Sequence, residues 1–151
     1  MDAYNIEAVD ENSVLFSKGE VSKELFLIKK GSFRVFKEEE GVIYLIGIRK
    51  SGSYLGEHSI LKKESLRKYS AVAAESSEII RIPYEDIDKI LREGPIWLRQ
   101  VFGTILSRSQ TLNEFLLTHR LYDDIEILEG NALKVIHNSI LEYRKSKGLK
   151  V

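Results

Sequence analysis

Residues 24–48 read ELFLIKKGSFRVFKEEEGVIYLIGI, and this stretch decides the fold. It is rich in Phe, Ile, Val and Leu, and aromatic and β-branched residues favour strands. Gly31 and Gly41 interrupt it, each beside polar or charged neighbours. Because glycines between short apolar runs are typical of tight turns, the pattern predicts successive β-hairpins.

Another strand-like region follows at residues 70–82, where SAVAA and EIIRI flank the turn-like pair Ser76-Ser77. Several short strands with regular turn signals predict a β-sandwich or barrel. The aromatic residues of these strands are expected in the core or on the strand surface, and not as platforms for stacked bases. They are Phe26, Phe33, Phe36 and Tyr44.

The pattern becomes helical after Pro83. Residues 84–91 carry apolar side chains at helical spacing, and Gly94-Pro95 ends that helix. We expect a longer helix to begin at Pro95, since proline is favoured in the first turn, and to run to about Thr118.

A last helix is predicted over Asn131–Lys147, with Asn131 as its N-cap and Gly148 after its end. The predicted fold class is therefore α+β: a β-jelly-roll (double-stranded β-helix) with C-terminal helices. Residues 1–120 are expected to form the roll with its long helix, and residues 121–151 a C-terminal helical extension of the same domain.

The long predicted helix carries a heptad-like apolar seam that Arg108 interrupts. Its members are Leu98, Val101, Ile105, Leu112 and Phe115. Two interpretations remain equally open: the seam forms a dimer contact, or it packs on the roll or on the last helix of the same chain.

Composition excludes several classes of function. Lys plus Arg equals Asp plus Glu at 23 each, so no net field attracts nucleic acid or an anionic membrane. There is no cysteine, which excludes disulfides and thiolate metal sites. The longest apolar stretches are too short to span a bilayer, and the acidic N-terminus is not a secretory signal. A cytoplasmic protein is expected. The histidines show no metal-ligand spacing; they are His58, His119 and His137.

The segment with chemical content is residues 52–73, GSYLGEHSILKKESLRKYSAVA. Gly56 lets the backbone approach a ligand closely, and the amides that follow it favour a phosphate. Arg67 offers a planar fork to two phosphate oxygens. Glu57 repels a phosphate, but its carboxylate suits a sugar hydroxyl that donates a hydrogen bond. Both residues can also be explained without a ligand. Arg67 would then be a solvated strand residue, and Glu57 an acid that complements a helix dipole.

This segment resembles the phosphate-binding cassette of the cyclic-nucleotide-binding domain family. The upstream stretch FSKGEVSKELFLIKKGSFRV and the downstream stretch VAAESSEIIRIPYEDI are similar to family motifs in the same order. The resemblance covers Ser13 to Asn113. The spacing between Gly56 and Arg67 is similar to that of the bacterial activator branch.

The resemblance implies a role for each matching residue. Glu57 would accept the ribose 2′-hydroxyl, and Arg67 would pair with the cyclic phosphate. The cradle would be completed by Gly56 and by backbone amides, and the base would be capped from the long helix. The implied ligand-binding residues are Gly56, Glu57, His58, Ser59, Arg67, Lys68, Thr111 and Asn113. No metal or separate cofactor is implied.

Some positions depart from the family pattern. Lys68 stands where a small residue is usual; it either adds charge to the phosphate or points to solvent. Tyr69 stands where alanine is usual, and if it faces inward it takes volume from the pocket or the core. Ala71, where valine is common, can compensate. His58 replaces an aliphatic residue.

The sequence thus predicts a cAMP-like sensor that signals by rearranging its C-terminal helices toward a protein partner or a second copy. cAMP is preferred over cGMP because Lys68 lacks the hydroxyl that the family's cGMP binders often use. The alternative is a degenerate scaffold that mediates protein contacts without ligand. An enzyme is not expected, since no nucleophile–base pair is present. Residues 123–151 are too few for a winged helix-turn-helix, so DNA is not an expected partner. The balanced charge and the short apolar stretches make a membrane an unexpected partner as well.

Overall fold

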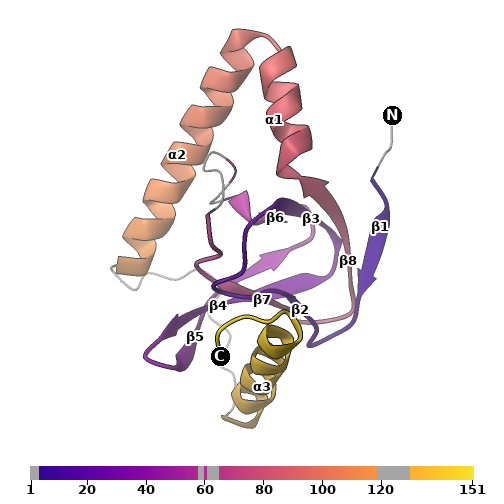
Figure 1. Ribbon diagram of the computed structural model, residues 1–151, viewed down its shortest axis with the longest axis vertical. Helices are drawn as coiled ribbons and strands as arrows, with labels where there is room; N and C mark the ends of the chain where they lie inside the picture. Colours follow the sequence, from indigo (N-terminus) through magenta and orange to yellow (C-terminus); the bar gives the residue numbers. More distant parts are fainter. Residues whose placement is uncertain (1–3, 58–59, 61–64, 119–129) are drawn as a thin grey trace.

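In the computed structural model, residues 4–57, 60, 65–118 and 130–151 are described. They form two antiparallel four-stranded sheets and three helices (Figure 1). One sheet has the order β1-β8-β3-β6 and the other β2-β7-β4-β5. The strands are β1 (Ile6–Val9), β2 (Val14–Phe16), β3 (Glu24–Lys30), β4 (Ser32–Glu39), β5 (Val42–Lys50), β6 (Tyr54–Leu55), β7 (Ser70–Ala73) and β8 (Ser77–Pro83). The helices are α1 (Tyr84–Glu93), α2 (Ile96–Thr118) and α3 (Gly130–Ser146). The predicted jelly-roll with C-terminal helices is confirmed.

The main core lies between the two sheets, and the alternation of side chains along the strands builds it. In β7, Ala71 and Ala73 belong to this core, whereas Val72 belongs to a second cluster beneath α3. Successive strand residues point to opposite faces, so β7 serves both clusters. The largest side chains of the main core include Phe16, Phe26, Phe33, Ile28 and Ile79.

The prediction of successive hairpins is correct at Gly41 and wrong at Gly31. β4 and β5 pair across the Glu40-Gly41 turn, but β3 pairs with β6 and β8 in the other sheet. The chain therefore changes sheets at Gly31. This glycine has φ 84°, and a Cβ there would lie 2.9 Å from the Cα of Ser77. Only glycine tolerates that backbone conformation and that contact.

The turn predicted at Ser76-Ser77 lies one position earlier. Ser77 is the first residue of β8, and its buried hydroxyl accepts a hydrogen bond from the amide of Ser32 at 3.2 Å. The Ser77 side chain is thus part of the sheet-changing corner beside Gly31. A polar residue that looked like a turn signal is a satisfied core residue.

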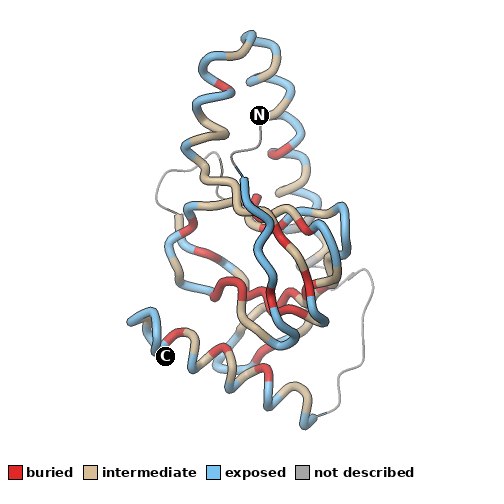
Figure 2. Tube along the Cα trace, turned by 90° about the vertical axis from the view of Figure 1, so that its right-hand side faces the viewer, coloured by how far each residue is buried: buried red, intermediate tan, exposed pale blue. Residues whose placement is uncertain are grey.

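α1 and α2 form a hairpin that projects away from the roll (Figures 1 and 2). α1 ends at Gly94, whose amide donates to the carbonyl of Ile90 at 2.9 Å. α2 begins at Ile96, one position after the predicted start at Pro95, and the Pro95 carbonyl accepts the amide of Leu98 at 2.9 Å, as the residue that caps a helix does. None of the described helices is long and apolar enough to cross a membrane.

The apolar seam of α2 is mostly uncovered. Leu98 is half-buried, but the other four seam residues are exposed: Val101, Ile105, Leu112 and Phe115. The described part of the chain therefore does not bury these four side chains, as full packing within the chain would require. Figure 2 shows the difference, since exposed positions dominate the hairpin and buried positions gather in the roll.

α3 covers the outer face of the sheet β2-β7-β4-β5, on the opposite side of the roll from the α1–α2 hairpin (Figure 1). Ile136 and Ile140 pack there against Phe36, Ile43 and Val72. The predicted end is confirmed: Gly148 has φ 66°, and the amide of Leu149 donates to the carbonyl of Arg144 at 2.9 Å.

The predicted N-cap of α3 is wrong. The helix already includes Gly130, so Asn131 lies inside its first turn. A cap residue must stand outside the helical conformation, which Asn131 does not do.

Candidate functional site

The candidate site centres on Arg67, whose side chain is 7% exposed. Its guanidinium carbon lies 4.4 Å from the centre of the Phe16 ring and 5.4 Å from that of Phe26. Nη2 donates to the carbonyl of Glu24 at 2.9 Å, and Nη1 to the hydroxyl of Tyr84 at 3.4 Å. Both acceptors are neutral, and burial lowers the pKa of Arg67.

Arg67 keeps unused capacity for an anion. Its Nε is buried and has no hydrogen-bond partner, and no salt bridge within the described part of the chain includes this arginine. The charges of Glu20 and Glu24 raise the pKa of Arg67 and partly offset its burial, but neither carboxylate forms an ion pair with it. A buried cation without a direct ion pair is costly. Phosphate oxygens are suited to this position because guanidinium binds them in a planar, charge-assisted fork.

Gly56 lies directly against Arg67. A Cβ at Gly56 would be 2.5 Å from Nη1 of Arg67 and 2.8 Å from the carbonyl oxygen of Glu24. The glycine also has φ 93°. Any other residue would displace the arginine or strain the backbone, so the predicted need for glycine has a concrete cause here.

Glu57 follows as a buried carboxylate at the start of a turn, in which the amide of Ile60 donates to the Glu57 carbonyl at 3.3 Å. The structure therefore brings together Gly56, Glu57 and Arg67, three of the predicted site residues. Two others, His58 and Ser59, lie outside the described residues.

The departures at Lys68 and Tyr69 have different outcomes. Lys68 is exposed, and its Nζ lies 3.8 Å from a carboxylate oxygen of Glu114 on α2, so it points away from the core of the roll. Tyr69 packs against the main core, as the inward alternative required. Burial raises the pKa of Tyr69, and the charges of Glu114 and Glu57 raise it further. Tyr69 thus lies between α2 and the cassette.

The long helix approaches the cassette through Glu114, and the described contacts do not bring Thr111 there. The Thr111 hydroxyl is exposed and donates to the carbonyl of Ser107 in its own helix at 3.0 Å. Asn113 lies on the same helix, and only its backbone is described. Base capping by these residues stays a prediction.

Sequence reasoning missed Tyr84, the first residue of α1. Its hydroxyl donates to the carbonyl of Gly56, lies 2.7 Å from the hydroxyl of Ser22, and accepts from Arg67. Tyr84 therefore joins the start of the cassette, its arginine and the beginning of a helix. The residue stands in the quoted family-like stretch, but helical periodicity carries no signal for a hydroxyl contact with residues so distant in sequence.

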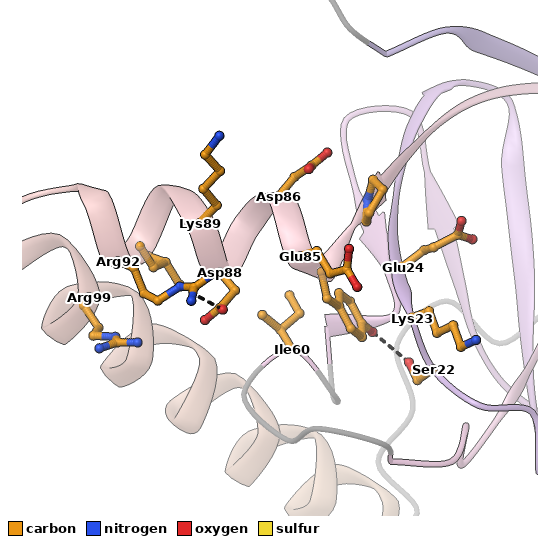
Figure 3. A pocket seen from close by; sticks show the side chains of 13 residues that line it. Ser22, Lys23, Glu24, Ile60, Glu85, Asp86, Asp88, Lys89, Arg92 and Arg99 are labelled. Carbon is orange, nitrogen blue, oxygen red and sulfur yellow. Dashed lines mark hydrogen bonds and ion pairs between the residues drawn. The ribbon is translucent and has the colours of Figure 1, made fainter.

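A cavity of about 1160 Å³ lies beside Tyr84, between the start of β3, α1 and the first turns of α2 (Figure 3). Side chains of both signs line it: Lys23, Lys89, Arg92 and Arg99, and Glu24, Glu85, Asp86 and Asp88. Arg92 and Asp88 pair with each other at 3.1 Å. This mixture favours no single ligand charge.

Comparison with known proteins identifies the family. The cyclic nucleotide-binding domain matches residues 6–93, which include both sheets, Gly56, Glu57 and Arg67. The chain belongs to this family of regulatory domains.

One curated protein and two solved structures illustrate what the chain is similar to. The global nitrogen regulator of Nostoc sp. (strain PCC 7120) is 26% identical over 121 residues, which cover 76% of this chain. The chain spans about half of that protein's length, at 53%. A transcriptional regulator from Thermotoga maritima has the same fold, with a TM-score of 0.65 and 17% identity over 80% of this chain and 98% of its own. The catabolite activator protein of Thermus thermophilus gives 0.62 and 18%, over 96% and 80%.

Proposed function

We propose that this chain is a cyclic-nucleotide sensor that binds cAMP or a close relative through Arg67 and Glu57. The observation that carries the proposal is the buried guanidinium of Arg67, directly against Gly56, whose Nε has no hydrogen-bond partner and which forms no salt bridge among the described residues. A cyclic phosphate would pair with this guanidinium directly, and Glu57 would accept the ribose hydroxyl.

Lys68 bears on the identity of the nucleotide. It offers no hydroxyl beside Arg67 and pairs with Glu114 instead, which favours cAMP over cGMP. We propose binding without turnover, because the site pairs an arginine and a carboxylate with no nucleophile–base arrangement. The described residues hold no cluster of three metal-ligating side chains.

Calorimetric titration with cAMP, cGMP and cyclic dinucleotides tests the proposal. Arg67→Ala and Glu57→Ala should each weaken binding about tenfold or more, since a charge-assisted hydrogen bond contributes about 1.5–3 kcal/mol. Arg99→Ala is the matched control: it removes an exposed arginine from the neighbouring cavity and should leave the affinity unchanged. If Arg99→Ala loses binding and Arg67→Ala retains it, the nucleotide binds in that cavity and not at Arg67.

The second candidate is a scaffold that keeps the fold without a ligand. Two observations favour it: Tyr69 takes up volume beside the core, and Arg67 already donates to the Glu24 carbonyl. If the wild-type chain binds none of these nucleotides at millimolar concentration, the result favours the hypothesis of a scaffold without a ligand.

The output that we propose is protein contact through α2, in the first place self-association. Its exposed seam presents apolar side chains with no cover from the described part of the chain, including Ile105 and Leu112. Replacing both with serine should abolish association while leaving the fold intact, because neither side chain is buried. Light scattering measures this; a wild-type monomer at high concentration, with and without cAMP, would remove the dimer.

A further inference from the structure

The turn at residues 17–20 lies between the cassette and α3. It is closed by the amide of Glu20, which donates to the carbonyl of Ser17 at 3.1 Å. The carboxylate of Glu20 accepts the amide of Ser17 at 3.2 Å. Gly19 has φ 87°, as the third position of such a turn requires. The turn is therefore a small, well-bonded unit that can transmit a displacement.

On one side this turn is fixed to Arg67 and to the first residue of β7, Ser70. The amide of Arg67 donates to the carbonyl of Glu20 at 2.7 Å, and the amide of Gly19 donates to the carbonyl of Arg67 at 2.9 Å. The amide of Lys18 donates to the hydroxyl of Ser70 at 3.0 Å. Any shift of Arg67 on binding an anion is thus passed to the turn through its backbone.

On its other side the same turn is held by the last turn of α3. Nε of Arg144 donates to the hydroxyl of Ser17 at 2.7 Å, and its Nη2 pairs with Glu38 of β4 at 2.5 Å. The hydroxyl of Tyr143 donates to the two carboxylate oxygens of Glu20 at 2.9 and 3.1 Å. Arg144 is buried, so its contact with Ser17 is shielded from water, whereas Tyr143 and Glu20 are half-buried.

We propose that the docking of α3 on the sheet β2-β7-β4-β5 is coupled to the nucleotide site through the 17–20 turn. This inference rests on the proposed cyclic-nucleotide function. A nucleotide that fixes Arg67 also fixes the turn, which presents Ser17 and Glu20 to α3 in one arrangement. The bound nucleotide therefore strengthens α3 docking, and a docked α3 strengthens nucleotide binding.

Linkage makes the two effects equal in size. The factor by which the nucleotide favours docked α3 must equal the factor by which docked α3 favours the nucleotide. α3 is suited to such a role because its packing is confined to one side of the helix. Its buried residues are Ile136, Ile140 and Arg144, and the helix joins the roll only through that side.

Hydrogen exchange of the α3 amides, measured on the full chain with and without saturating cAMP and in parallel with cGMP, tests the coupling. In the wild type, cAMP should slow exchange over 130–146 severalfold. Tyr143→Phe removes only the hydroxyl that binds Glu20; it should speed exchange without nucleotide, reduce the slowing by cAMP, and weaken cAMP binding by a similar factor. Tyr44→Phe, which removes an exposed hydroxyl from β5, is the matched control and should behave as the wild type.

Calorimetry on the same samples separates the two hypotheses. Wild-type chain that binds cAMP or cGMP with no change in α3 exchange overturns the coupling and leaves the sensor function intact. The coupling is also overturned if Tyr143→Phe shows the full response to nucleotide. Absence of binding to both nucleotides in the wild type overturns the sensor function, and the coupling with it.

Discussion

α2 and α3 both follow the β-roll, but they contact it in opposite ways. α2 projects with α1 and leaves most of its apolar seam exposed, and it contacts the segment after Arg67 through an exposed ion pair, Lys68–Glu114, at 3.8 Å. α3 buries its apolar side and closes it with the buried Arg144. Most of the apolar seam of α2 stays exposed, whereas the apolar side chains of α3 that face the sheet are buried within the chain.

The contrast separates two kinds of sequence pattern. Both helices carry apolar side chains at helical spacing, yet only α3 finds a complementary sheet face. Exposed ion pairs contribute little because water and salt screen them, whereas buried apolar contacts contribute several kcal/mol. The attachment of α3 should therefore contribute more to the stability of the described domain than that of α2, and α2 should be the easier helix to move.

The largest expected effect comes from a matched pair of isoleucines. Ile140 on α3 is 0% exposed, and Ile105 on α2 is 57% exposed. Ile140→Ala should lower the free energy of unfolding by about 2–5 kcal/mol, because it leaves a cavity under α3. Ile105→Ala should change it by no more than about 0.5 kcal/mol. Urea unfolding measures both changes. Equal losses of unfolding free energy would show that the two helices do not differ in how firmly they are attached to the roll.

An intermediate effect is expected from pH. The hydrogen bond from Arg144 lowers the pKa of Glu38, and the charges of Arg144, Lys18 and His137 lower it further. Because the folded pKa is depressed, the stabilisation is complete above the ordinary glutamate range and is lost as pH falls through the lower folded value. α3 amides should therefore exchange progressively faster, relative to their intrinsic rates, in acid.

Glu38→Gln sharpens this test. It keeps an acceptor but removes the charge, so it should weaken α3 docking by about 1.5 kcal/mol at neutral pH, where the partly exposed carboxylate is ionised. It should also remove the acid-dependent part of the exchange. Glu39→Gln, at an exposed pair with Lys37, is the control. An acid response in Glu38→Gln as large as in the wild type would assign the effect to other groups.

The smallest effect is expected at the Lys68–Glu114 pair. Both side chains are more than half exposed, so Glu114→Gln should change the free energy of unfolding by about 0.5 kcal/mol or less. Nucleotide affinity should change little as well. A loss above 1 kcal/mol, measured by urea unfolding in 0.15 M salt, would show that α2 is held more firmly than its exposure indicates.

Much of the fold was predictable because its signals are local. The change from strands to helices at Pro83, the Glu40-Gly41 hairpin and the end of α3 at Gly148 all rest on neighbouring residues. The same holds for Gly56, Glu57 and Arg67, which stand close together in one short segment. The hairpin predicted at Gly31 was wrong because a glycine in a tight bend gives the same sequence signal in two cases. The next strand can pair with the previous one, or it can join the other sheet.

The amino-acid sequence by itself determined the class of fold and the family, and it marked Gly56, Glu57 and Arg67 as candidates for a site, because periodicity, turn chemistry and motif spacing act over short distances. The tertiary structure alone decided what surrounds Arg67 and what α3 contacts. Tyr84 reaches Gly56 across 28 positions, and Arg144 reaches Ser17 across 127. Such contacts form only after the sheets have closed, and no local pattern of side chains encodes them.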